Sequence, residues 1–80
     1  MLIVKLTLAE ATTAVKELIG HIEASTLEDE SEARSVLLAN QAINKLLKKF
    51  PEILEISSLI EEDLEHIHPW IKDAKKVIEK

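Results

Sequence analysis

Apolar residues recur with helical spacing over the C-terminal third of the chain. From Ile60 the stripe continues in steps of four, three, four, three and four residues, through Leu64, Ile67, Ile71, Ala74 and Ile78. Such steps place side chains on one side of an α-helix, so the pattern predicts a helix that faces a core. Ile53 and Ile56 extend the stripe backwards.

Two prolines divide this region. Pro51 ends the preceding apolar pattern or opens the next, which predicts a third helix from about Pro51 to near Lys80. Pro69 lacks an N–H and clashes with the preceding turn, so we expect a kink or a complete break there. The apolar phase survives across Pro69, which favours the kink. A capping-box pattern beginning at Ser58 makes a break near Ser57 a second alternative.

A first helix is predicted from Leu8 to about Glu23. Thr7-Leu8-Ala9-Glu10 has the form of a capping box at its start. The stripe on this helix comprises Met1, Val4, Leu8, Ala11, Val15, Leu18 and Ile22. Residues 1–7 also alternate as in a strand, which would need a second copy of the molecule to pair with. We favour the helix over the strand, and an extension of the helix toward Ile3 is left open.

A second helix is predicted from about Leu27 to Lys49, with Thr26 as its N-cap. Its stripe comprises Val36, Ala39, Ile43, Leu46 and Phe50, with Leu47 beside it. Acidic residues crowd the starts of the second and third helices and lysines crowd their ends, so each complements its own dipole. Short connections favour antiparallel packing. The sequence therefore predicts an all-α, antiparallel three-helix bundle with a long third helix kinked at Pro69, or a four-helix bundle in which Pro69 opens the last helix.

Composition supports one small helical domain over residues 1–80. The chain has 46% hydrophobic residues, one glycine, no cysteine and only two aromatic residues, Phe50 and Trp70. A net charge of −5 argues against a nucleic-acid partner. No apolar run reaches the roughly 20 residues of a membrane helix, and the first residues lack the basic region and cleavage site of a signal peptide. A cytoplasmic protein is therefore expected.

The segment His66-Ile67-His68-Pro69-Trp70 holds the unusual chemistry of the chain. On a regular helix the two histidines point about 200° apart and cannot share an ion. Glu65 and His68 form one Glu-x-x-His motif, whereas di-iron bundles use two, and both residues fall on the outward flank. A metal-binding bundle with His and Glu ligands is the alternative function; no metal or cofactor site is predicted.

Protein interaction is the function class that the sequence favours. No phosphate loop, nucleophile elbow or zinc-protease motif is present, so we expect no enzyme. If the third helix continues through Pro69, a second stripe widens its apolar face and forms a candidate interface: Leu59, His66, Trp70 and Val77. Trp70 is its candidate anchor for a protein partner or a second copy.

The restricted composition and dipole-matched charges of the chain are also compatible with an engineered or designed bundle. Thr12, Thr13 and Gly20 inside a helix are untypical of an idealised design.

Overall fold

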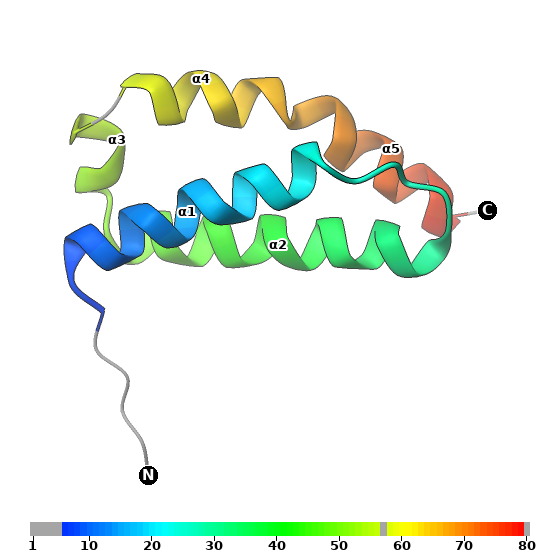
Figure 1. Cartoon of the computed structure of the whole chain (residues 1–80), viewed down its shortest axis with the longest axis horizontal. Helices are drawn as coiled ribbons and strands as arrows, with labels where there is room; N and C mark the ends of the chain where they lie inside the picture. The colour runs from blue at the N-terminus through cyan, green and yellow to red at the C-terminus, as the bar shows by residue number, and fades with distance from the viewer. Residues whose placement is uncertain (1–5, 57, 80) are drawn as a thin grey trace, which may run out of the picture.

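The computed structural model describes residues 6–56 and 58–79, without the side chains of Ser58 and Leu59. The described part is all-helical and contains no strand, as the sequence predicts. Its helices are α1 (Leu8–Glu23), α2 (Glu30–Lys49), α3 (Glu52–Ile56), α4 (Ser58–His66) and α5 (His68–Glu79) (Figure 1). The alternation assigned to residues 1–7 falls mostly outside the described residues, which begin at Leu6.

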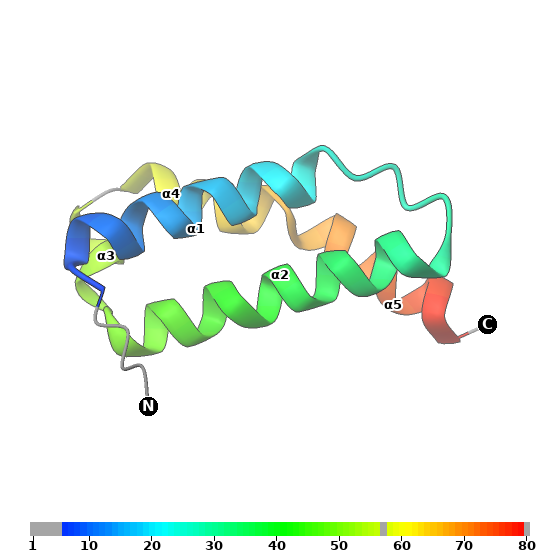
Figure 2. The same ribbon diagram turned by 60° about the horizontal axis from the view of Figure 1, so that its bottom comes forward.

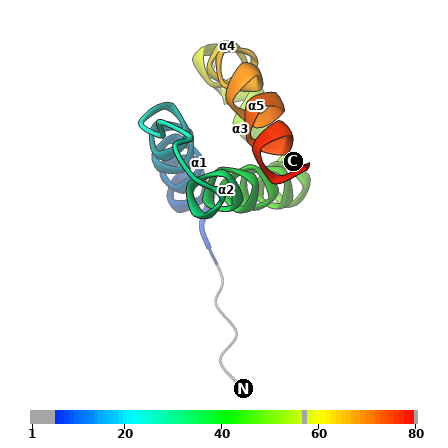
Figure 3. The same cartoon turned by 90° about the vertical axis from the view of Figure 1, so that its right-hand side faces the viewer.

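The helix α2 is the centre of the arrangement. α1 packs antiparallel along one side of it, and α5 packs along another side, with its C-terminal end beside the start of α2 (Figures 1 and 3). The short α3 turns the chain at the far end, and α4 returns beside α1. α4 and α5 therefore lie on the same side of the α1–α2 pair, and Figure 2 looks onto the pair from its other side.

Aliphatic side chains from all five helices form one core. Those buried are Ala11, Val15, Ile19, Ile22, Ala33, Val36, Ala39, Ile43, Ile53, Ile60, Ile67, Ile71 and Ala74. The predicted stripes are confirmed in their central positions. On α1 the buried position is Ile19, whereas Leu18 is half-buried at the edge. Within the described residues, no helix combines the length and apolarity needed to cross a bilayer.

The start of α1 is fixed by the predicted capping box. The Thr7 backbone N–H donates to Glu10 Oε1 at 3.0 Å, and the Glu10 N–H donates to Thr7 Oγ1 at 3.2 Å. The hydroxyls of Thr12 and Thr13 donate to the carbonyls four residues earlier, at 2.8 and 3.1 Å. These bonds supply a partner for each hydroxyl within the helix.

The predicted start of α2 is wrong by one turn. The N-cap is Asp29, which accepts from the Glu32 N–H at 2.8 Å, and not Thr26. Leu27 has a φ of 54°, in the left-handed region, so the helix cannot pass through it. The connection between α1 and α2 is therefore longer than the sequence predicts, and Leu27 packs against the core from within it.

The predicted single third helix is divided into α3, α4 and α5. α3 ends at Ile56 and α4 begins at Ser58, which agrees with the alternative of a break near Ser57. Ile56 is consequently 60% exposed instead of lying on the core stripe, because the helical phase is interrupted before Ile60.

The second division lies at Ile67, one residue before α5. Pro69 is the second residue of α5, where its missing N–H costs least. The Ile67 N–H still donates to Asp63 O at 3.0 Å, and the Ile71 N–H to Ile67 O at 3.3 Å. Helical bonding therefore persists on both sides of the bend. The four-helix alternative, with Pro69 opening the last helix, fits the described residues, and α4–α5 also retains the direction of one kinked helix.

Candidate functional site

Trp70 lies where α5 meets the connection between α1 and α2. Its indole is half-buried against the core, and its Nε1–H donates to Ser25 O at 3.3 Å. The residues are 45 positions apart, so this bond fixes α5 to the connection. The proposed anchor for a partner is thus already engaged within its own chain by both its apolar body and its donor.

Among the predicted interface residues whose side chains are described, His66 has its ring close to that of Trp70. Their ring centroids are 5.3 Å apart with an interplanar angle of 53°. His66 Nε2 lies 3.8 Å from Glu23 Oε2 at the end of α1, and the His66 side chain is 61% exposed. Val77 is half-buried against the core, two turns further along α5. The side chain of Leu59 falls outside the described part. The structure therefore joins His66 to Trp70, and leaves little of Trp70 and Val77 to a partner.

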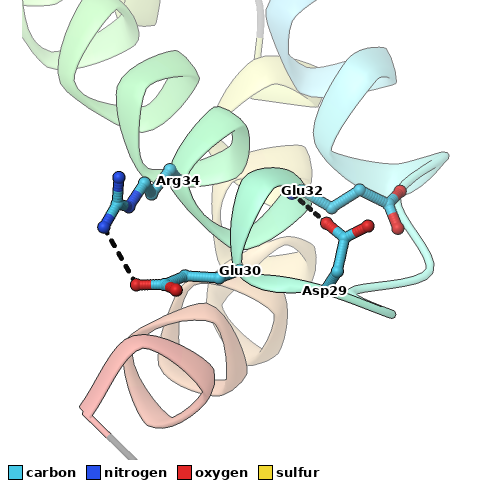
Figure 4. A network of polar contacts seen from close by, with 4 residues as sticks. All are labelled: Asp29, Glu30, Glu32 and Arg34. Atoms are coloured by element: carbon cyan, nitrogen blue, oxygen red, sulfur yellow. Dashed lines mark hydrogen bonds and ion pairs between the residues drawn. The ribbon is translucent and has the colours of Figure 1, made fainter.

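The α1–α2 connection is held by the carboxylate of Glu32. It accepts from the hydroxyls of Ser25 at 3.5 Å and Thr26 at 3.0 Å, and from the Glu28 N–H at 3.2 Å. Figure 4 shows Glu32 beside Asp29, which caps the helix that carries it. All these groups have structural partners within the connection, so they form a brace for the turn and not a reactive site.

Ion pairs contribute little at the same end of the molecule. Arg34 and Glu30 approach to 2.9 Å one turn apart on α2, with side chains 66% and 57% exposed (Figure 4). Such exposed pairs stabilise a helix by a few tenths of a kcal/mol at most. This pair therefore indicates neither a buried charge nor a binding site.

The histidines do not assemble a metal centre. Glu65 and His68 are exposed, as their predicted outward flank requires, and line a hollow with Leu54, Glu61 and Leu64. Within the described residues, no three His, Asp or Glu side chains are placed to hold one ion. His21 Nε2 instead lies 2.8 Å from Ser35 Oγ, which joins α1 to α2 across their outer side.

An apolar surface runs along that outer side of the α1–α2 pair, away from α4 and α5. We define the outer face by the residues that line its central hollow: Ala14, Glu17, Leu18, His21, Ser35, Leu38, Ala39 and Ala42. A second hollow adjoins it at Ala14 and Glu17, and a third at Ser35 and Leu38. The hollows therefore form one continuous surface over both helices.

Leu38 stands at the centre of this surface with 65% of its area exposed. The neighbouring alanines are small, so the backbone of another helix could approach closely. From the sequence, Leu38 is recognisable only as a leucine outside the core stripe of α2. Ala14 and Ala42 carry no signal alone, because their meeting depends on how α1 pairs with α2.

Comparison with known proteins gives no further assignment. No protein family model, curated protein or solved structure matched this chain.

Proposed function

We propose that this protein is a non-enzymatic helical interaction module, and that its outer face receives a helix of its partner. The observation that carries the proposal is Leu38, 65% exposed beside an apolar hollow that both α1 and α2 line. Burying such a leucine stabilises a complex by up to about 1.5–3 kcal/mol before the costs of association. A helix in a groove between two helices is a common mode of peptide recognition.

The dimensions of the outer face suit a helix of ordinary length. The 16 residues of α1 span about 24 Å, which would accommodate more than four turns of a partner helix. The acidic Glu17 and the polar Ser35 at the rim would contact the polar flanks of that helix. Interfaces commonly combine an apolar centre with such a polar rim.

The surface first predicted around Trp70 supports the proposal less well. Trp70 donates its N–H to Ser25, and Val77 packs against the core, so both have intramolecular roles. Leu38 is 65% exposed and lines the outer face, whereas α4 and α5 lie on the other side of the α1–α2 pair (Figure 2). We therefore assign the interaction to the outer face.

A single thiol label tests this assignment. The chain lacks cysteine, so Ser31→Cys, which lines the hollow beside Leu38, carries one environment-sensitive dye and leaves Leu38 in place. Glu62→Cys on the exposed side of α4 is the matched control. The probe is a synthetic amphipathic helix of zero net charge, with a leucine stripe between one acidic and one basic edge. Zero net charge limits unspecific attraction to the acidic protein.

The expected result is a saturable blue shift of the dye at position 31 and no change at position 62. The protein is kept at low micromolar concentration so that the probe is the main available occupant. An unchanged dye at position 31 at millimolar probe, or equal shifts at both positions, would refute the assignment of the outer face.

A further inference from the structure

We infer that the occupant of the outer face is a second copy of this chain, in a two-fold dimer whose axis runs parallel to α1 and α2. The inference rests on the proposed function, because it names the partner of the same surface. It follows from three properties of the outer face: its shape, its charges and its area. Each favours a copy of the face itself over an unrelated helix.

The shape is self-complementary. His21 and Ser35 are in contact, which sets these residues at the same level along the antiparallel pair. Leu18 and Leu38 each lie three residues further toward the middle of their helix, so these two residues are also level with each other. A two-fold axis parallel to the helices preserves levels and places α1 of one copy opposite α2 of the other. Leu38 of each copy then meets the hollow beside Leu18 of its partner.

The charges match in the same arrangement. Glu10 and Glu17 lie two turns apart on α1 and line the hollows, so the α1 edge is acidic. Lys45 lies two turns beyond Leu38 on α2 and is exposed, so the α2 edge is basic there. By the same register Glu10 is level with Leu46, next to Lys45. The parallel axis therefore sets the acid of each copy against the lysine of the other.

The alternative axis, perpendicular to the helices, is disfavoured. It would place α1 opposite α1, so the acidic edges of both copies would face each other near Glu17. Like charges at such contacts oppose association. Both axes make every neighbouring helix pair antiparallel, so the helix dipoles do not distinguish them and the charges do.

The area predicts a weak dimer. A face about 24 Å long and about 20 Å wide would remove about 1,000 Å² from water over the two copies. That is the lower limit for a specific interface, so we expect a dissociation constant on the order of 10–100 µM. Small apolar side chains and the Leu38 contacts would provide its centre.

Sedimentation velocity over a concentration series tests the dimer. Leu38→Glu puts a charge at the centre of the interface and should raise the dissociation constant at least about 100-fold. Ile56→Glu is the matched control, because Ile56 is 60% exposed on α3 and lies outside the outer face. This variant should dimerise as the parent does. Circular dichroism must show both variants equally helical.

The axis is tested by charge and by distance. Lys45→Glu should weaken the dimer about tenfold, whereas Lys75→Glu on α5 makes the same charge change and should leave it unaltered. Spin labels on Ser31→Cys and Lys49→Cys, near opposite ends of α2, should each give one short distance between copies. A perpendicular axis would lengthen both distances, and that outcome would overturn the proposed arrangement.

The fluorescence of Trp70 separates this dimer from one built on the surface first predicted. Trp70 is on α5, away from the outer face, so its emission should stay constant while the dimer dissociates. An emission that reddens on dilution would overturn the inference in favour of an interface at Trp70.

Failure of the dimer and failure of the interaction module are distinguishable. A parent that stays monomeric at millimolar concentration, while the dye at position 31 still responds to the synthetic helix, overturns the second copy alone. A dimer that Leu38→Glu and Ile56→Glu weaken equally overturns the outer face as the site of both. A dimer lost only in Leu38→Glu supports the inference.

Discussion

Replacement of Trp70 by phenylalanine tests whether this residue fastens α5 to the α1–α2 connection. The substitution removes the hydrogen bond to Ser25 O, worth about 1 kcal/mol net. It also removes roughly 40 Å² of ring surface from the half-buried site, or about 1 kcal/mol. We expect the free energy of unfolding to fall by about 2 kcal/mol.

Urea unfolding followed by far-UV circular dichroism measures this loss, since the variant has no tryptophan to report by fluorescence. A domain of this size changes its melting temperature by about 4–8 °C for each kcal/mol, so a decrease of roughly 10 °C should accompany it. Benzothienylalanine at position 70 keeps two fused rings but lacks the N–H. It should lose about 1 kcal/mol, which isolates the hydrogen bond.

Ile56→Ala is the control for replacing a large apolar residue at an exposed position, and should change stability by less than about 0.5 kcal/mol. If Trp70→Phe unfolds within about 0.3 kcal/mol of the parent, Trp70 does not fasten the connection and the reasoning is wrong. Trp70 would then be available to a partner after all.

Three further predictions concern the ends and the surface of the helices. Gly20→Ala should stabilise the protein by about 0.5–1 kcal/mol in urea unfolding, because an added Cβ meets nothing within 4 Å and the backbone there is helical. A loss of stability would contradict this prediction. Asp29→Ala should lower the free energy of unfolding by about 1 kcal/mol in the same assay. Glu32→Ala should loosen the α1–α2 connection, so an unchanged rate of proteolysis there would argue against the brace. Hydrogen bonds from the Thr7 backbone N–H, and then from its side chain, lower the pKa of Glu10 from 4.5. The stability from this cap is therefore present above the ordinary carboxyl range and is lost as pH falls through the lowered pKa. A carboxyl titration by NMR with its midpoint at or above 4.5 would refute this prediction.

Much of the fold follows from sequence because its causes are local. The capping box at Thr7 needs only a hydroxyl and a carboxylate three residues apart, and both bonds form. The core stripe from Ile60 to Ala74 survives the bend at Ile67, since Pro69 enters at the start of a helix where its missing N–H is tolerated.

The start of α2 required tertiary information. Thr26 and Asp29 are both acceptable N-caps by residue type. Asp29 is the N-cap because the chain must first cross from α1 to α2, and in this crossing Leu27 is left-handed and packs on the core. The exposure of Ile56 has a similar origin, since a break between α3 and α4 changes which side of the helix meets the core.

The candidate site divides in the same way. The sequence identified Trp70 as an amphipathic contact residue, and the structure supplies its partner, Ser25, which is 45 residues distant. Leu38 was recognisable as a leucine off its stripe, yet only the pairing of α1 with α2 brings Ala14 and Ala42 beside it. Periodicity thus determined which side of each helix is apolar, because that depends on spacing within one segment. Which apolar surfaces are covered depended on how the helices pack, and our proposal of the outer face over the surface at Trp70 rests on that packing.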